Sequence, residues 1–414
     1  MRHDTLAAFG GEPISKDAVR FDWPRITPEI ERVVLRQLNE AVSIYDNSGV
    51  FGEFEEEFAN YHGRKHGLLS NSGTSSILAM FDALGVCPGD EILCPVYSFH
   101  ATVSPMMSLG AVPVFCDCDD FGNISFDEIV GKTTAKTRAI IVTHMWGDPV
   151  ADIQKIKVFA EKNDLKLLED CSHAHGSAIF GKMVGSFGDA AAWSLQGQKT
   201  ITGGEGGILL TDDKSIFEQS LLHGHYNKRP KKQIAETDPL YQYSLTGKGL
   251  KLRAHPIAVA IALHGLRGLD ALLEVRKQHA AMLCSAFEGC VYCQPHYNFE
   301  ARQSFYALKL RYDHRSAPSG LSKDDFVKIL HAEGLVEFDI PGSTGLLNDL
   351  PLFLHPGQLF PGLYHHALPL QSGFQNAEKF TEGFIKLPVW SFADETPKVR
   401  TYVEGIRKVL DALG

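Results

Sequence analysis

The sequence predicts an α/β fold, with a mainly parallel sheet in a three-layer large domain and a smaller C-terminal α+β domain. Between about residues 66 and 210, short apolar runs alternate with amphipathic helical stretches. Strands spaced by helices in this way are joined by crossover connections, which produce parallel sheet. A chain of 414 residues is long enough for one large core and a second, smaller one. The tail, roughly 284–414, mixes strands, helices and prolines, which is typical of an α+β domain.

The strands expected in the large domain are short and apolar: 67–69, 91–94, 112–115, 139–142, 165–168 and 208–210. The helices expected between them cover 74–84, 102–109 and 151–163. The polar segment 227–248, with a basic cluster at 228–232, is expected to be a long loop, and a helix follows over 256–283. We therefore place a large domain with an N-terminal arm at residues 1–265, and a linker helix with the small domain at 266–414.

Composition and charge restrict the functional class. The chain is 44% apolar, no apolar run approaches the length of a membrane span, and the first residues lack the long apolar segment of a secretory signal. We therefore expect a cytoplasmic protein without a membrane partner. A formal net charge of −10 argues against non-specific binding of nucleic acid, although a locally basic site for an anionic substrate is compatible with it.

The eight cysteines are scattered along the chain. Cys116 and Cys118 form one close pair and Cys290 and Cys293 another, but neither is accompanied by a second, well-spaced pair. A structural zinc needs four ligands, so we expect no metal site. Reduced, buried thiols are the better interpretation.

Lys199 has the most informative surroundings in the chain. It lies among small, uncharged residues, five positions after Ser194 and just before the glycine-rich turn 203–207. Such surroundings can desolvate an amine and lower its pKa, which makes it a competent nucleophile for a Schiff base. Most lysines are instead solvated surface charges, so the neighbouring motifs must decide between the two interpretations.

Two further candidates follow strands of the same predicted sheet, where ligands bind in open α/β folds. Asp170 ends the apolar run that begins at residue 165. It suits a partner for the nitrogen of a pyridinium ring, although an isolated aspartate at this place is more often a helix N-cap or a turn residue. Phe99 follows the strand 91–94 and suits stacking on an aromatic ring, although a phenylalanine in the core is more common.

A candidate phosphate cradle comprises Ser72, Gly73, Thr74 and Ser75, which follow a strand and open a helix. Glycine permits close approach of the backbone, and the hydroxyls and free amides at a helix start bind phosphate. The same residues would also make an ordinary helix N-cap. Ser194 could add another hydroxyl to the same phosphate.

The glycine-rich turn 203–207 does not match a dinucleotide fingerprint, because it precedes a strand and does not open a helix. A turn that lets the backbone pass close to a cofactor is the better account. A Schiff-base amine, a carboxylate for a ring nitrogen, a phosphate cradle and a stacking aromatic are together the parts that pyridoxal phosphate requires.

The sequence resembles the fold-type I sugar aminotransferases of the DegT/StrS group. The matching motifs occur in the family's order and cover nearly the whole chain. They are residues 54–55, 72–74, 95–102, 144–147, 169–176, 188–189, 194–199, 204–207, 253 and 387–388.

The resemblance implies roles for individual residues. Lys199 would hold pyridoxal 5'-phosphate as a Schiff base, Asp170 would pair with its pyridine nitrogen and Phe99 would stack on its ring. His173 would lie near the ring oxygen, although a satisfied core histidine is the alternative. The phosphate would be held by Ser72, Gly73, Thr74, Ser75 and Ser194.

One position departs from the family pattern Gly-x-Asn-x-Arg, in which a neighbouring subunit's asparagine reaches the cofactor phosphate. Here residues 249–253 place Lys251 at the asparagine position. Lys251 would bind the phosphate as a point charge, or face the substrate. The resemblance implies a homodimer with composite active sites, in which the basic cluster 228–232 could serve the neighbouring site.

The activity that the resemblance implies is transamination. An amino group would pass from glutamate or glutamine to the cofactor, leaving pyridoxamine phosphate, and then to a nucleotide-linked or phosphorylated keto sugar in amino-sugar or antibiotic-type biosynthesis. Released Lys199 would act as the general acid and base. A keto cyclitol or an aminated aromatic precursor is the alternative. A dehydratase of the same fold is disfavoured because histidine replaces the lysine there, and a noncatalytic regulator is disfavoured by the intact set of residues.

Overall fold

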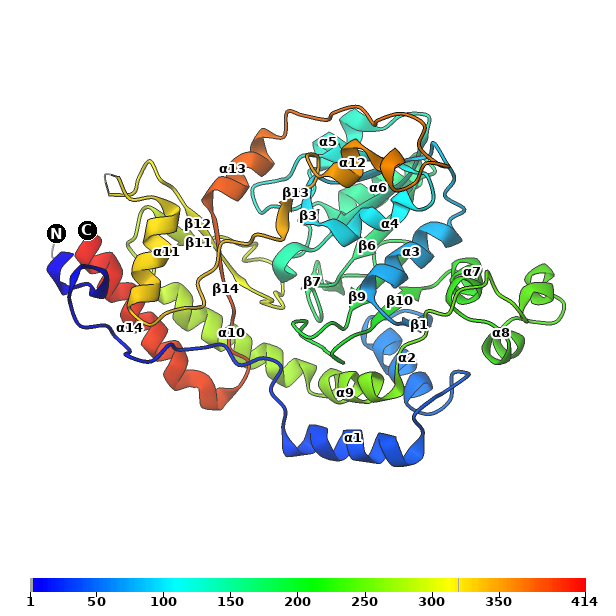
Figure 1. The fold of residues 1–414 in the computed structure, drawn as a ribbon, viewed down its shortest axis with the longest axis horizontal. Helices are drawn as coiled ribbons and strands as arrows, with labels where there is room; N and C mark the ends of the chain where they lie inside the picture. The colour runs from blue at the N-terminus through cyan, green and yellow to red at the C-terminus, as the bar shows by residue number, and fades with distance from the viewer. Residues whose placement is uncertain (1–2, 319) are drawn as a thin grey trace.

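The computed structural model describes residues 3–318 and 320–414, and a seven-stranded sheet forms the centre of its larger part (Figure 1). In chain order the strands are β1 (His66–Ser70), β2 (Glu91–Pro95), β4 (Val112–Cys116), β5 (Thr137–Thr143), β6 (Lys166–Asp170), β9 (Ala190–Ser194) and β10 (Gly207–Thr211). Their spatial order is β1-β10-β9-β6-β5-β2-β4. β10 runs antiparallel to both of its neighbours, and the remaining pairs are parallel. The predicted mainly parallel α/β sheet is therefore confirmed.

Helices cover both faces of this sheet and so make three layers. Consecutive strand residues point to opposite faces, and in β6 Leu167 and Leu168 therefore belong to different cores. One face is covered by α3 (Gly73–Ala83), α4 (Ser104–Met107) and α7 (Lys214–Gly224). The other is covered by α2 (Val50–Tyr61), α5 (Phe126–Lys132), α6 (Ile153–Lys162) and α9 (Pro256–Arg267). Burial of both faces explains why the strands read as continuous apolar runs.

A second, antiparallel sheet organises the C-terminal part, as expected for an α+β unit. It consists of β11 (Cys293–Pro295), β12 (Leu308–Tyr312) and β14 (Phe384–Leu387). It shares a core with α10 (Leu269–Ser285), α11 (Lys323–Ala332) and α14 (Thr396–Leu413). Leu6 is buried in the same core, so the N-terminal arm packs on the C-terminal part, and Figure 1 shows η1 (His3–Thr5) and η2 (Ala7–Phe9) beside the end of α14.

One C-terminal stretch returns to the large sheet. β13 (Thr344–Leu346) pairs with β3 (Tyr97–Phe99), which follows β2 (Figure 1). Phe353, in α12 (Pro351–Leu354), and Phe374, before α13 (Gln375–Gly383), are buried in the core of the large sheet. This return brings residues 339–346 over the edge of the sheet where the parallel strands end.

Several expected elements differ in the structure. The segment 227–248 contains α8 (Lys228–Gln233) and the 3-10 helix η5 (Pro239–Tyr243), because buried Arg229 pairs with Glu55. The helix expected over 256–283 is two helices, α9 and α10, which meet at Gly268 with a bend of 61°. The helix expected over 102–109 is η3 (His100–Thr102) followed by α4. β9 was not expected, since its sequence begins with three alanines, which have weak strand propensity.

The remaining elements are short or peripheral. They are α1 (Pro28–Glu40), β7 (Ala178–Ile179), β8 (Lys182–Met183), and the 3-10 helices η1 (His3–Thr5), η2 (Ala7–Phe9), η4 (Met145–Gly147), η6 (Pro356–Gln358) and η7 (Ala393–Glu395). Among the residues described, no single helix is long and apolar enough to cross a membrane; the bent pair α9–α10 passes that test by length and composition only.

Candidate active site

A cleft of about 400 Å³ lies at the carboxyl ends of the parallel strands, between the large sheet and the C-terminal part. We call it the central cleft. Its walls come from the start of α3, the ends of β3 and β6, the turn after β9, and the segment 339–344. The sequence-predicted residues that line it are Ser72, Gly73, Thr74, Phe99, Asp170, His173, Ser194 and Lys199.

Lys199 is held in the turn after β9. Its backbone N–H donates to the carbonyl of Gln196 over 2.8 Å, and its own carbonyl accepts from Nε1 of Trp23 over 3.2 Å. Burial lowers the pKa of the Lys199 amine to about 8; the Asp170 carboxylate opposes this shift and the Lys386 ammonium adds to it. Near pH 8, the neutral fraction of this amine is therefore larger than that of an ordinary lysine. A nucleophile that forms a Schiff base has to be neutral.

Asp170 is buried at the end of β6 with both carboxylate oxygens hydrogen-bonded. Oγ1 of Thr102 donates to Oδ2 over 2.7 Å, and the backbone N–H of Ser172 donates to Oδ1 over 3.0 Å. These donors fix the position of the carboxylate. The sequence motif 95–102 included Thr102 but gave no sign that its hydroxyl reaches residue 170.

His173 lies in an aromatic stack inside the central cleft. Its ring is 4.1 Å from that of Tyr306 at an interplanar angle of 7°, and 5.3 Å from that of Trp146. The backbone N–H of Trp146 donates to Nδ1 over 3.3 Å, so the proton of the neutral ring is on Nε2. Burial, with the charge of Lys199, lowers the pKa of His173 well below its ordinary value. His173 is therefore neutral, with its Nε2–H placed to act as a donor.

The backbone on both sides of this stack is strained. Trp146 has φ 59° and Phe305, next to Tyr306, has φ 48°, a left-handed conformation that bulky residues rarely adopt. Such strain concentrates at functional sites. Sequence reasoning did not identify Tyr306, because it comes from a separate stretch of the chain outside the matched motifs.

The phosphate cradle depends on close backbone packing. Oγ of Ser72 accepts from the N–H of Ser75 and caps α3. A Cβ atom at Gly73 would lie 2.8 Å from Cβ of Ser194, so only glycine lets the helix start approach β9. The free N–H groups of the first helical turn and the hydroxyls of Thr74 and Ser194 are thereby brought together.

Of three further residues predicted to contact the cofactor, Phe99 lines the central cleft, whereas Ser75 and Lys251 do not. Phe99 has 41% of its surface exposed and lines the central cleft, as a stacking residue would and a core phenylalanine would not. Ser75 donates its hydroxyl to Oδ1 of Asn71 and does not line the central cleft. Lys251 is exposed and lies outside the central cleft of its own chain.

These residues fit pyridoxal phosphate. Glycine at position 73 lets the start of α3 lie against β9, and a buried amine, a buried carboxylate and a partly exposed aromatic ring face the same space as the cradle. A family model decides the assignment: that of the DegT/DnrJ/EryC1/StrS aminotransferase family matches residues 44–401. The chain belongs to this family. The predicted family and the predicted aminotransferase are thus confirmed, and the family implies pyridoxal phosphate as the cofactor.

Individual relatives agree with the family. This aminotransferase is 31% identical to a putative L-glutamine:3-amino-2,3-dideoxy-scyllo-inosose aminotransferase of Micromonospora echinospora, over 81% of this chain and 78% of the relative. It is 26% identical to GDP-perosamine synthase of Vibrio cholerae, over 89% and 94% of the two chains. The solved structure of an aminotransferase from Psychrobacter cryohalolentis superposes with a TM-score of 0.82 at 24% identity, over 95% of this chain and 99% of that one, and confirms the fold.

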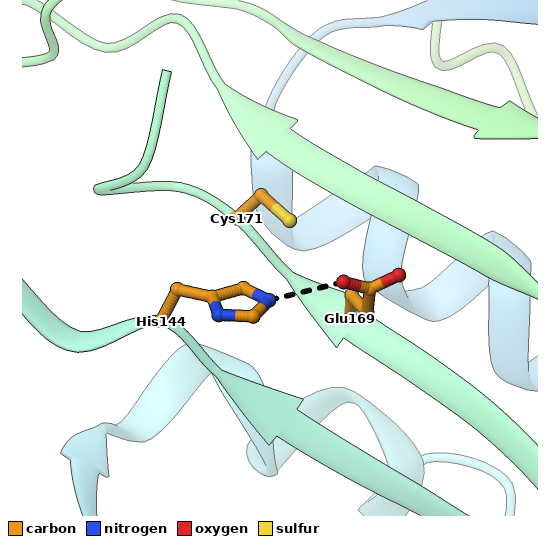
Figure 2. A group of neighbouring side chains, drawn as sticks. All are labelled: His144, Glu169 and Cys171. Carbon is orange, nitrogen blue, oxygen red and sulfur yellow. Dashed lines mark hydrogen bonds and ion pairs between the residues drawn. The ribbon is translucent and has the colours of Figure 1, made fainter. Parts of the chain in front are cut away.

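A buried group of metal-ligating residue types lies on the other side of β6 in this aminotransferase. Figure 2 shows His144 facing Glu169, with Cys171 beside them. The N–H of Val150 donates to Nδ1 of His144, so its Nε2 carries the proton that it donates to Glu169 over 3.0 Å. Glu169 also accepts from three backbone N–H groups of residues 185–188, and burial raises the pKa of the Cys171 thiol well above its ordinary value. We interpret this group as a structural hydrogen-bond cluster that fixes the loops beside Asp170.

Proposed function

We propose that this aminotransferase holds pyridoxal phosphate covalently at Lys199 and transfers an amino group from glutamate or glutamine to a nucleotide-linked or phosphorylated keto sugar. The observation that carries the proposal is the buried Lys199 amine, whose pKa is lowered to about 8 in the same cleft as Asp170 and the phosphate cradle. A lysine with only a structural role does not require a lowered pKa, a facing carboxylate and a nearby phosphate cradle.

Each residue has a defined task in this proposal. Bound pyridoxal phosphate supplies an electron sink for the carbon that carries the amino group. Asp170 would face the ring nitrogen and keep it positively charged, and His173 would donate from Nε2 to the ring oxygen. Nζ of Lys199 would serve as the general base and acid that takes the proton from the α-carbon of the donor and returns it during amine transfer. Closely packed Tyr306 and Trp146 keep water from this part of the cleft.

A keto cyclitol is the second candidate acceptor. The observation that favours it is the 31% identity with the inosose aminotransferase, while the likeness to GDP-perosamine synthase favours a nucleotide-linked sugar. A panel of keto acceptors added to the pyridoxamine form of the enzyme separates them: the substrate class is the one that restores the visible absorbance of the pyridoxal form at micromolar to millimolar concentration.

The covalent attachment is tested with Lys199→Ala. The wild type reconstituted with pyridoxal phosphate is expected to show a visible absorbance band that fades when glutamate or glutamine is added. The Lys199→Ala variant is expected to lack the band while it keeps its far-ultraviolet circular dichroism. Lys182→Ala, which removes an exposed lysine on β8, is the matched control. A wild type without the band in excess cofactor, or a Lys199→Ala variant that keeps it, contradicts the proposal.

We further propose that the active unit is a homodimer in which Lys251 and the basic cluster 228–232 serve the neighbouring site. Exposed apolar side chains support it: they gather on α1 and on residues 243–250, next to Lys251. Mixed dimers of Lys199→Ala chains with Lys251→Ala chains test the arrangement. If Lys251 acts on the other subunit, each mixed dimer contains one complete site and regains activity. If it acts on its own subunit, or on none, mixing restores nothing beyond the parent variants.

A further inference from the structure

Lys386 is a second cation in the wall of the central cleft. It lies on β14 of the C-terminal part, and its side chain is about one-third exposed. Its Nζ atom is 3.0 Å from Oδ2 of Asp339 and 5.4 Å from the centroid of the Trp146 ring. Its charge reaches the reacting groups, because it lowers the pKa of both His173 and Lys199.

The residues that would hold the cofactor do not include Lys386. In the proposed function the phosphate would lie at the start of α3, the ring nitrogen at Asp170 and the aldehyde at Lys199, and these residues belong to the large sheet and its loops. Lys386 faces the same space from the opposite wall, where the reacting end of a substrate has to lie. A cation at that place suits an oxyanion of a substrate.

The side chains of Lys386 and Asp339 can separate while their backbones stay paired. The backbones of the two residues are joined by two hydrogen bonds of 2.9 Å, N–H of each to the carbonyl of the other. The side chains can therefore separate without movement of β14. The Asp339 carboxylate is half exposed, and ion pairs with this much exposure contribute little to stability. An incoming oxyanion can thus replace Asp339 on the ammonium group.

We propose that Lys386 is a specificity-determining residue that exchanges Asp339 for an oxyanion of the substrate. The oxyanion is a carboxylate of the amino donor or a phosphate of the acceptor, and this inference rests on the proposed aminotransferase function. Asp339 holds the ammonium in place when the substrate is absent, and competes with the substrate for it.

The two half-reactions identify the source of the oxyanion. Conversion of the pyridoxal form by glutamate or glutamine reports on the donor, and conversion of the pyridoxamine form by a keto acceptor reports on the acceptor. Lys386→Ala is expected to raise KM about 10-fold or more in the half-reaction whose substrate carries the oxyanion, with a smaller change of kcat. Asp339→Asn is expected to lower the same KM, because the ammonium loses its competing carboxylate. Lys379→Ala, on the exposed side of α13, is the matched control.

A measurement without cofactor tests whether the charge is placed as described. In the cofactor-free protein, Lys386→Ala is expected to raise the pH midpoint at which Lys199 reacts with an amine reagent, and Lys379→Ala to leave it unchanged. An increase of KM in both half-reactions supports the inference for both substrates. If wild type converts substrate and Lys386→Ala matches Lys379→Ala within about two-fold, or changes kcat alone, the inference is overturned while the proposed function stands. If wild type converts no substrate, the proposed function fails and this inference fails with it.

Discussion

Thr102 donates its hydroxyl proton to Oδ2 of Asp170 over 2.7 Å, and the two residues are 68 positions apart in the sequence. Both side chains are buried, so the hydrogen bond replaces the water that would otherwise solvate the carboxylate. Together with the N–H of Ser172 it gives each carboxylate oxygen of Asp170 one donor and leaves each oxygen able to accept another. The position of the Asp170 carboxylate, which we propose faces the ring nitrogen, is therefore set by η3 as well as by β6.

Removal of this hydroxyl tests its contribution. Thr102→Val keeps the shape of the side chain and removes the donor. A hydrogen bond to a charged group contributes about 1.5–3 kcal/mol, so the affinity for pyridoxal phosphate is expected to fall roughly 10- to 100-fold. Equilibrium dialysis of the cofactor measures the change. Asp170→Asn, which removes the charge itself, is expected to have the larger effect; equal affinity of Thr102→Val and wild type contradicts the assigned role.

The lowered pKa of Lys199 predicts a distinct pH dependence. Only the neutral amine attacks an aldehyde, and its fraction rises as the pH passes through the pKa of about 8, compared with 10.5 for an ordinary lysine. The rate at which cofactor-free protein reacts with pyridoxal phosphate is therefore expected to rise with a midpoint near pH 8. Because the Asp170 carboxylate favours the ammonium form, Asp170→Asn is expected to move the midpoint to lower pH.

Stopped-flow absorbance measures these rates, and unphosphorylated pyridoxal is the control that separates amine titration from phosphate binding. A wild-type midpoint near 10.5 would show that Lys199 is solvated. An upward shift in Asp170→Asn would show that the carboxylate does not interact with the amine in the way described.

The sequence predicted site residues that lie at the ends of strands, and it did not predict those that packing of the C-terminal part brings to the cleft. Asp170 ends a strand that the sequence predicted, and the ends of parallel strands meet at one edge of a sheet, so the pattern of strands was enough to place it there. Ser194 ends β9, which was not predicted, and it was found only through the family motif that also contains Lys199. Tyr306 and Lys386 reach the central cleft only because the C-terminal part packs against the sheet, and no periodicity along the chain encodes that contact. The hydroxyl of Ser75 is bound by Asn71, and the sequence does not specify that local hydrogen bond.

Arg276 connects the turn that carries Lys199 to the segment before β12 that carries Tyr306. It is buried, donates from Nε to Oγ of Ser391 over 2.9 Å and from Nη1 to Oγ1 of Thr200 over 3.0 Å, and also reaches the carbonyl of Phe305. Burial lowers its pKa to about 10. Arg276→Met leaves these buried partners unsatisfied, so the free energy of unfolding is expected to fall by about 2–4 kcal/mol.

Urea denaturation measures this loss. Arg267→Met is the matched control, because Arg267 ends α9 and pairs with Glu53 and Glu57 at the surface. Its expected effect is below about 1 kcal/mol. Equal stability of the Arg276→Met and Arg267→Met variants would mean that the buried hydrogen bonds contribute no more than exposed ion pairs.

Gly207 lets the start of β10 pass directly beneath the phosphate cradle. A Cβ atom at this position would lie 2.3 Å from the carbonyl oxygen of Ser72 and 2.5 Å from the nitrogen of Gly73, both of them backbone atoms that cannot move without displacement of α3. Gly207→Ala is therefore expected to destabilise the protein by about 1–3 kcal/mol and to weaken binding of pyridoxal phosphate. Gly197→Ala is the control in the turn that precedes Lys199, because its added Cβ meets nothing closer than 3.9 Å.

Thermal unfolding and cofactor titration of the two glycine variants give the comparison. The Gly197→Ala protein is expected to match or slightly exceed the wild type in stability, since alanine lowers the entropy of the unfolded chain. The unfolding measurements should be made without cofactor, so that a loss of bound ligand does not add to the loss of packing. If Gly207→Ala binds pyridoxal phosphate as tightly as Gly197→Ala does, the start of α3 does not hold the phosphate in the way its geometry indicates.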